Sequence, residues 1–327
     1  MRRMVQLALG FGLGGVFLWL TLRSVDPAPM VAALRGAKGE ALLLAPLCLA
    51  IGYACRIHRW RLMLRPANPG LGVGRTAVAF VASIAVNNLA PFRLGDALRC
   101  FGFSGWLGVA PGAILASVVI ERLLDMIALL LALALALWWF SLSGDALGIG
   151  RGSALVLAVL AIAALLVLGQ PRVLAPIVSA VRRGMGRLGP GARARADGFL
   201  GPLQQALTGL SARRAMVALI GWTVPVWLFE GATYWAVARA MPALVAPDAA
   251  WLAMPVGTLA TLLPSTPGHI GTFDYFAQLA TVAGGNPLAE ATAFVVIIHV
   301  VLWLTTTLAG GLCLGIWGLN RAGRGRT

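Results

Sequence analysis

The sequence predicts an all-α polytopic membrane protein with six full transmembrane helices and two re-entrant hairpins, arranged as an inverted-topology repeat. Three observations predict this class: the apolar composition, six long apolar runs, and two shorter runs that end in polar, breaker-rich segments. Of the 327 residues, 59% are hydrophobic and 11% are charged, and the mean hydropathy is +0.86. Soluble domains have about 45–50% apolar and about 25% charged residues. Because so few charges cannot cover a water-facing surface, a cytosolic enzyme and a disulfide-stapled secreted domain are excluded.

Six stretches are long enough to be transmembrane helices. A helix needs about 20 mostly apolar residues to cross a hydrocarbon core about 30 Å thick. The stretches that meet this requirement are 5–22, 41–63, 111–140, 152–169, 215–241 and 287–319. The first could be a signal peptide, but its apolar run is too long for a typical h-region and no A-x-A site follows before Asp26. We therefore expect an uncleaved first helix.

Two apolar runs, 76–90 and 249–263, are too short to cross comfortably, since each would be about 22 Å long as a helix. They end in polar segments rich in proline, glycine and asparagine, 87–96 and 262–274. Non-helical backbone at membrane depth persists only where it is buried in protein or lines a wet cavity. The sequence therefore predicts re-entrant hairpins at 76–96 and 249–274.

The distribution of basic residues predicts the orientation. The chain has 26 Lys and Arg against 11 Asp and Glu, a net charge of +15, and basic residues collect in cytoplasmic loops. With both termini cytoplasmic and the two hairpins re-entrant, most arginines, including those of the basic segment 170–214, lie inside. If both short runs crossed fully, that segment would lie outside. We expect it to rest on anionic lipid rather than on nucleic acid, because no aromatic residues alternate with its arginines.

The two predicted hairpins resemble each other. In each, a charged residue precedes a proline at the same spacing, and a glycine follows that proline four positions later (Arg75, Pro91 and Gly95; Asp248, Pro264 and Gly268). An odd number of crossings separates them, so the halves would face opposite ways. Inverted repeats with broken helices are typical of transporters. We therefore divide the chain into two membrane repeats, 1–150 and 151–327.

Several ionisable residues fall inside or beside the predicted spans, where they are costly by about 2.5–3.5 kcal/mol or more and are functional candidates. Glu121 and Asp125 share a helix face with Arg122 adjacent to them. Glu230 lies in mid-span. The other candidates flank the two hairpin tips: Arg93 and Asp96 at the first, and His269 and Asp274 at the second.

These charges have two interpretations. They could be structural ion pairs, such as Arg122 with Asp125 or Arg93 with Asp96. Alternatively, they line a polar cavity in which the arginines hold an anionic head group and the acids couple movement to protonation. The apparent excess of acidic over basic groups in the interior favours the cavity, since unpaired buried carboxylates tend to bind protons. His299 alone, within the last span, is interpreted as a core histidine.

No motif predicts a cofactor or a metal. The sequence has no Walker loop, dinucleotide fingerprint, zinc-protease motif or nucleophile elbow. The four cysteines lack metal-ligand spacing: Cys48, Cys55, Cys100 and Cys313. We therefore expect no cofactor, no metal and no ATP-driven step within this chain.

Five segments together resemble the transmembrane family named after lysylphosphatidylglycerol synthase. They are RIHRWRLML at 56–64, NLAPFRLGD at 88–96, ERLLD at 121–125, Glu230-Gly231, and PGHIGTFD at 267–274. In order and spacing these segments cover nearly the whole chain. The family pattern usually has glycine where this sequence has His269.

The resemblance implies a bacterial inner-membrane protein related to the flippase part of the multiple peptide resistance factor synthases, without their soluble synthase domain. It implies a flippase-like lipid transporter, and it singles out seven of the candidates above: Arg93, Asp96, Glu121, Arg122, Asp125, Glu230 and Asp274. The expected partner is a membrane lipid, such as a phospholipid, a glycolipid or a polyprenyl carrier. On this hypothesis Arg93→Ala or Glu230→Gln abolishes lipid flipping and leaves folding intact.

Three alternatives remain open. The chain could be an integral membrane lipid-modifying enzyme that uses Glu121 and Asp125 as acid–base groups, although it lacks an obvious nucleophile. It could be a secondary transporter of a small solute, which would share the inverted repeat. It could also be a scaffold for a partner glycosyltransferase or lipid-synthesis enzyme.

Overall fold

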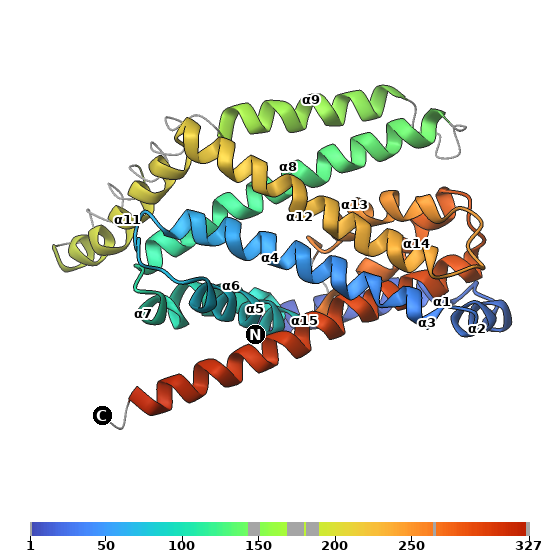
Figure 1. Cartoon of the computed structure of the whole chain (residues 1–327), viewed down its shortest axis with the longest axis horizontal. Helices are drawn as coiled ribbons and strands as arrows, with labels where there is room; N and C mark the ends of the chain where they lie inside the picture. The colour runs from blue at the N-terminus through green and yellow to red at the C-terminus, as the bar shows by residue number, and fades with distance from the viewer. Residues whose placement is uncertain (1, 143–150, 169–179, 181–189, 264–265, 325–327) are drawn as a thin grey trace.

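The computed structural model describes residues 2–142, 151–168, 180, 190–263 and 266–324, and the regular secondary structure among these residues is entirely helical (Figure 1). In the part of the chain that is described, four helices are long and apolar enough to cross a membrane: Gly39–Leu64, Pro111–Phe140, Arg213–Arg239 and Leu288–Asn320. They correspond to α3 (Gly39–Leu42) with α4 (Leu44–Leu64), and to α8 (Pro111–Leu142), α12 (Arg213–Arg239) and α15 (Leu288–Arg324). The all-α, multi-pass membrane class is therefore confirmed.

The other two predicted spans are also helical, but their apolar parts are shorter than those of the four long helices. They form α1 (Arg2–Leu22) and α9 (Arg151–Leu168), whose apolar parts are Phe11–Leu22 and Gly152–Val167. Residues 170–179 and 181–189 of the basic segment 170–214 lie outside the described residues, and the later part of the segment forms α11 (Pro190–Leu210). A short helix, α2 (Pro27–Arg35), follows α1 and is capped by Asp26, whose carboxylate accepts a hydrogen bond from the backbone N–H of Ala28 at 2.9 Å.

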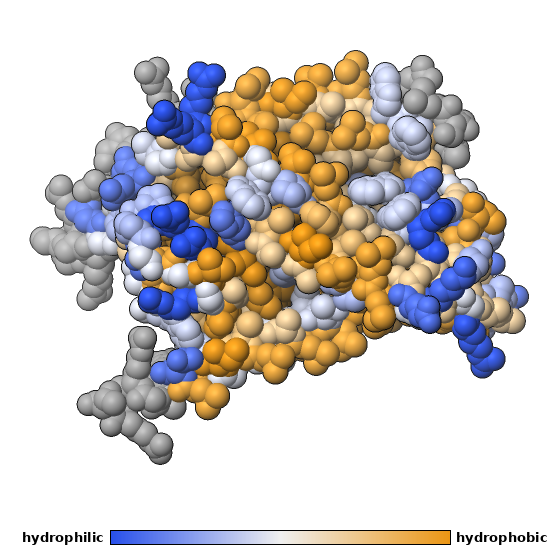
Figure 2. Space-filling model, viewed as in Figure 1, coloured by the Kyte–Doolittle hydropathy of each residue, from blue (hydrophilic) through white to orange (hydrophobic). Residues whose placement is uncertain are grey.

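The long helices run roughly along the longest axis of the molecule (Figure 1). Helix α12 packs along α4, α15 packs along α5 (Val73–Leu89), and α8 packs against α9 and α11. Hydrophobic side chains cover the middle of the visible face, whereas hydrophilic residues gather towards its two ends (Figure 2). This distribution is the one expected for a protein whose middle faces hydrocarbon.

The first predicted hairpin is a reversal of the chain. Helix α5 runs in, and short helices return: η1 (Pro91–Arg93), α6 (Leu94–Ala97), η2 (Leu98–Gly102) and α7 (Ser104–Leu107). The two ends are tied together, because the Asn68 side chain donates to the carbonyl of Leu107 at 2.7 Å. Near the tip, a Cβ on Gly95 would lie 1.8 Å from the carbonyl oxygen of Ser83, so this close approach requires glycine.

The second predicted hairpin is also a reversal. It consists of η3 (Pro247–Ala249), α13 (Ala250–Ala260), η4 (Pro267–His269) and α14 (Thr272–Ala283). An asparagine again ties its ends, since the side chain of Asn286 accepts from the Ala246 N–H and donates to the Ala246 carbonyl, both at 2.9 Å. In Figure 1, α7 lies towards the left end of the molecule and α14 towards the right end, so the hairpins open towards opposite ends.

Each hairpin packs into its own hydrophobic core. The first core contains Trp60, Phe80 and Phe103, and the second contains Tyr234 and Phe294. Helices α4, α8 and α12 contribute residues to both cores. These helices therefore connect the two cores, and they carry several of the charges described next.

Candidate functional site

The tips of the two hairpins meet in the middle of the fold. The guanidinium of Arg93, at the first tip, donates to the carbonyl of Thr261, at the second, over 3.4 Å. Among the described residues, the non-glycine residues with positive φ are Phe92 (59°), Arg93 (53°) and His269 (60°), and all of them lie at these tips. Such conformations cost about 1–3 kcal/mol each and cluster at functional sites. The backbone strain therefore marks the junction of the tips as a candidate site.

A polar cavity of about 200 Å³ lies at this junction. Asn88 from the first hairpin, Thr261 and His269 from the second, Glu230 of α12 and His299 of α15 are among the residues that line it. Its volume is below the range of about 300–1,000 Å³ typical of sites for drug-sized ligands. It suits a small polar group rather than a whole lipid.

The wall of this cavity includes Tyr234, a fully buried tyrosine of α12. In the described part of the chain, its hydroxyl has Thr258 as a polar neighbour but forms no hydrogen bond of standard geometry. A buried hydroxyl without a good partner is costly and calls for an explanation. A polar group bound in the cavity would supply one.

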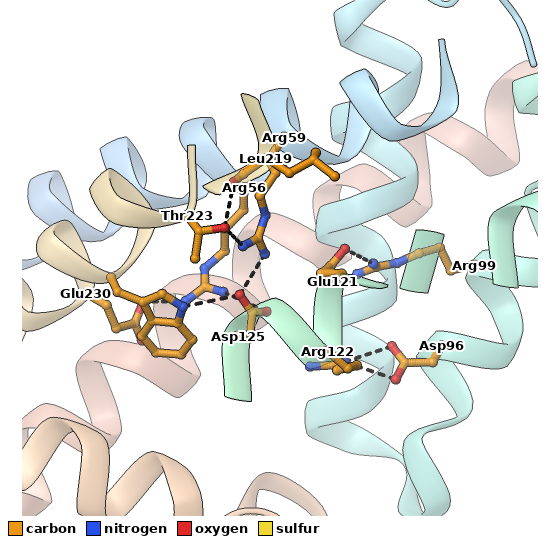
Figure 3. A network of polar contacts seen from close by, with 11 residues as sticks. Arg56, Arg59, Asp96, Arg99, Glu121, Arg122, Asp125, Leu219, Thr223 and Glu230 are labelled. Atoms are coloured by element: carbon orange, nitrogen blue, oxygen red, sulfur yellow. Dashed lines mark hydrogen bonds and ion pairs between the residues drawn. The ribbon is translucent and has the colours of Figure 1, made fainter. Parts of the chain in front are cut away.

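Beside the cavity, Arg56 of α4 joins two carboxylates (Figure 3). Its Nη2 lies 3.2 Å from Oε2 of Glu230, and its Nη1 lies 3.7 Å from Oδ2 of Asp125. Arg59, one helical turn away, donates to Oδ1 of Asp125 at 2.8 Å and to the Thr223 hydroxyl at 2.8 Å. Two arginines of α4 thus neutralise the acids of α8 and α12.

Three further ion pairs lie near these residues in the described part of the chain, and they range from fully buried to partly exposed. Arg99 of η2 pairs with Glu121 at 3.0 Å, with side-chain exposures of 0% and 4%. Arg122 contacts both carboxylate oxygens of Asp96, at 3.1 and 3.0 Å (Figure 3). In the third pair, Asp274 lies 2.6 Å from Nδ1 of His299.

The structure corrects the predicted pairing of these groups. Asp125 pairs with Arg59 and Arg56 rather than with Arg122, and Asp96 pairs with Arg122 rather than with Arg93. The expected excess of acids in the interior is also wrong. Arg59 and Arg99, neither of them a predicted site residue, are only 1% and 0% exposed.

These buried arginines were missed because an arginine at the end of an apolar run usually anchors at the head-group level. The sequence did contain an indication of paired burial for two arginines of α4, because Arg56 and Arg59 are three residues apart and so share a helix face. Of the eight predicted site residues, Glu230 and His269 line the cavity. Arg93 contacts its wall at Thr261, and Asp274 is linked to it through His299. The remaining four lie in the ion pairs beside it: Asp96, Glu121, Arg122 and Asp125.

A second, apolar cavity of about 610 Å³ lies between α8, α12 and α13. Its walls include Trp139, Trp227 and Trp251, together with Thr223. The indole of Trp227 donates to Asp125 at 3.2 Å, and the guanidinium of Arg56 lies 4.7 Å from the centre of its ring. Arg56 therefore contacts wall residues of both cavities, because its other partner, Glu230, lines the polar one.

Within the described residues, no three His, Cys, Asp or Glu side chains are grouped so that they could hold a metal ion. The described residues at the site offer ion pairs and hydrogen bonds beside two cavities.

Comparison with known proteins agrees with this architecture. The chain is 25% identical over 342 residues to the protein named glycosyltransferase AglD of Haloferax volcanii. That match covers 94% of this chain and 54% of the relative, so the chain spans about half the length of the curated relative. The family model described as the lysylphosphatidylglycerol synthase TM region matches residues 6–310. The match includes both hairpins and most of α1 and α15, and the chain therefore belongs to this membrane family.

Proposed function

We propose that this protein binds an amphipathic membrane lipid with its polar head at the junction of the hairpin tips and moves it between leaflets. The observation that carries the proposal is the polar cavity at which two chain reversals meet inside an apolar molecule. Broken helices that meet near the midplane are typical of secondary transporters.

The proposed topology has six crossings and two re-entrant hairpins, which belong to inverted repeats at 1–150 and 151–327. It is supported by the side-chain ties at the open ends of the hairpins, from Asn68 and Asn286. It is also supported by the opposite directions in which the hairpins open (Figure 1). We infer a bacterial inner-membrane location with both termini cytoplasmic, because this orientation keeps the basic segment 170–214 inside.

The head group is proposed to be anionic because Arg93 differs from the other arginines beside the cavity. Arg56 and Arg122 each form an ion pair with a carboxylate, whereas Arg93 forms none with the described residues and contacts a carbonyl instead. A guanidinium binds phosphate through charge-assisted, often bidentate hydrogen bonds. A phosphate-bearing head group is therefore its best-matched ligand.

The hydrocarbon part of the lipid is proposed to occupy the apolar cavity between α8, α12 and α13. Its volume of about 610 Å³ falls in the usual range for ligand sites, and its walls are almost entirely apolar. The polar and apolar parts of the lipid would then have separate sites. Arg56, which contacts wall residues of both cavities, would lie between the polar and the apolar parts of the bound lipid.

The test is lipid transfer between leaflets of vesicles that contain the purified protein and a labelled phosphatidylglycerol. Arg93→Ala is expected to slow transfer by about tenfold or more, since hydrogen bonds to charged groups contribute about 1.5–3 kcal/mol. Arg65→Ala, which removes an exposed arginine beyond α4, is the matched control and should leave the rate unchanged. Undiminished transfer in a folded Arg93→Ala variant would remove the tip junction from the proposal.

A second candidate is favoured by the name of the relative, which is a glycosyltransferase about twice as long as this chain. The membrane region would then present a polyprenyl or other lipid carrier to a glycosyltransferase partner, or it would itself modify the lipid. Mass spectrometry of a lipid extract incubated with the purified protein separates these outcomes, because a new lipid product appears only if the chain is an enzyme. Solute transport without any lipid dependence would contradict both candidates.

A further inference from the structure

The pair formed by Asp274 and His299 has an arrangement that ion pairing alone does not explain. Nδ1 of His299 lies 2.6 Å from Oδ1 of Asp274, and Nε2 lies 3.0 Å from the carbonyl oxygen of Gly268. The other oxygen of Asp274 accepts the N–H of Gly271 at 2.8 Å. His299 therefore connects α15 with both the tip of the second hairpin and the start of α14.

The number of protons in this arrangement follows from its geometry. A backbone carbonyl and an ionised carboxylate can only accept hydrogen bonds. Two hydrogen bonds between a histidine ring and two such acceptors require two protons. Either His299 carries both of them beside an ionised Asp274, or each residue carries one. In both cases the pair holds two protons and its net charge is zero. The number of protons therefore does not depend on how they are divided between Asp274 and His299.

Loss of one proton must break one of the two contacts. With a single proton, one ring nitrogen would present a lone pair to an oxygen acceptor at 2.6 or 3.0 Å. A hydrogen bond to a carboxylate is stronger than one to a neutral carbonyl. The remaining proton is therefore expected to stay between Nδ1 and Asp274, and the contact with Gly268 is expected to open.

Loss of the contact between His299 and the carbonyl of Gly268 is expected to release the backbone at the tip of the second hairpin. Gly268 has φ of +72°, it is followed by His269 at +60°, and Trp303 packs so closely that a Cβ on Gly268 would lie 2.8 Å from the indole nitrogen. Such strained backbone persists only while the surroundings hold it. Gly268, His269 and His299 all line the polar cavity, so release of the tip would change the shape of the cavity.

We propose that Asp274 and His299 form a proton-binding site, and that its proton closes the tip of the second hairpin against the head-group cavity. The use of this site in lipid movement rests on the function proposed above. The charged and titratable groups that share the junction are Glu230 and Tyr234 of α12, His269 of η4, Tyr53 of α4 and Arg93 of the first tip. Glu230 is neutralised by Arg56, so loss of the proton adds one negative charge to the cavity.

That charge couples the proton to the lipid. An anionic head group would be repelled by the deprotonated pair and accepted by the neutral one, so binding of lipid and binding of the proton favour each other. Such coupling is reciprocal by thermodynamic necessity. The structure thereby offers a route by which a proton gradient could drive movement of an anionic lipid.

The first test counts the protons by NMR on the full chain in detergent micelles, without added lipid. The chain has three histidines, His58, His269 and His299, so ring ¹⁵N signals can be assigned by single substitutions to glutamine. The infrared band of a protonated carboxyl, taken as the difference between wild type and Asp274→Asn, completes the count. We expect two protons on the pair while both contacts of the His299 ring are formed, and an altered His299 signal, with an unaltered His58 signal, in Asp274→Asn. One proton in total would overturn the proposal.

The second test follows the tip by hydrogen exchange of peptides that cover 266–275, corrected for the intrinsic effect of pH. In the wild type, protection should be lost as the pH is raised and the pair gives up its proton. His299→Gln keeps an amide donor for the Gly268 carbonyl but does not titrate, so its protection should not depend on pH. His299→Phe has no donor and should be unprotected at both pH values.

The same pH-dependent loss in His299→Gln as in the wild type would contradict the proposal. Peptides around Asn68 provide the internal control, because Asn68 binds Leu107 at the base of the first hairpin, away from the tip of that hairpin. Neither test uses lipid, so both remain decisive even if Arg93→Ala shows that the chain does not move lipid.

Discussion

Arg56 and Glu230 are 174 residues apart in the sequence, yet Nη2 of Arg56 lies 3.2 Å from Oε2 of Glu230. The pair joins α4 to α12, and Arg56 also faces Asp125 of α8 at 3.7 Å. One guanidinium thus serves carboxylates from two helices, and the side chains that it contacts line both cavities.

Arg56→Met is expected to destabilise the protein because it leaves Glu230 without its cation. Breaking a buried pair by removing one partner costs about 3–5 kcal/mol. The double variant Arg56→Met, Glu230→Gln should recover much of this loss, since it leaves no uncompensated charge on Glu230. Unfolding in mixed micelles measures the free-energy differences, with Arg65→Met as the exposed control. A double variant as unstable as the single one would refute this explanation.

Glu230→Gln alone is expected to cost less stability than Arg56→Met, because Arg56 retains Asp125 as a partner. The sequence-based expectation that this variant leaves folding intact is therefore revised to a moderate loss. Its effect on lipid transfer must be compared at equal amounts of folded protein, measured by size-exclusion chromatography.

Two adjacent glycines of α15 should respond in opposite ways. A Cβ on Gly310 would lie 2.4 Å from Cβ of Ala85 and 2.5 Å from the carbonyl oxygen of Val81, both in α5. A Cβ on Gly311 would meet nothing within 4 Å. Gly310→Ala should lower the free energy of unfolding by about 1–3 kcal/mol through overpacking. Gly311→Ala should raise it by roughly 0.5–1 kcal/mol, because alanine favours the helix. Equal effects on unfolding in micelles would mean that α5 and α15 do not pack as described.

Asn286 should be important for the closure of the second hairpin. Its buried side chain makes three hydrogen bonds to backbone groups of Ala246 and Thr281. At about 1 kcal/mol for each bond, Asn286→Ala is expected to cost roughly 3 kcal/mol of stability. Asn320→Ala, at an exposed position of α15, is the control and should cost little. Equal unfolding curves for the two variants would contradict the role of Asn286.

The re-entrant topology can be tested by labelling single introduced cysteines with a membrane-impermeant maleimide in intact cells. Gly70→Cys and Gly105→Cys, at the exposed base of the first hairpin, should react only after permeabilisation. Val245→Cys and Pro287→Cys, at the exposed base of the second, should react in intact cells. Labelling of the unmodified chain provides the background from its own four cysteines. If position 70 and position 105 label from opposite sides, α5 belongs to a full crossing and the proposed topology fails.

The local pattern of the sequence was enough to predict the long apolar helices, the two chain reversals and the burial of Glu121 and Asp125. Each depends on a few neighbouring residues: an apolar run favours lipid or core, breakers such as Pro91 and Gly95 end a helix, and positions 121 and 125 share one face. The free energy of exposing an apolar side chain, or of ending a helix, depends mainly on the residue itself and its near neighbours in the sequence. The local sequence pattern therefore contained this information.

The partners of the charges were decided by the tertiary structure alone. Arg99 meets Glu121 only because the first hairpin folds back onto α8, and His299 reaches Gly268 only because α15 passes the second tip. An arginine has the same local preference whether it ends at a lipid head group or at a carboxylate 174 residues away, as Arg56 does. Transfer of a side chain from water is a property of the residue, whereas ion pairing is a property of two distant residues and the packing that brings them together.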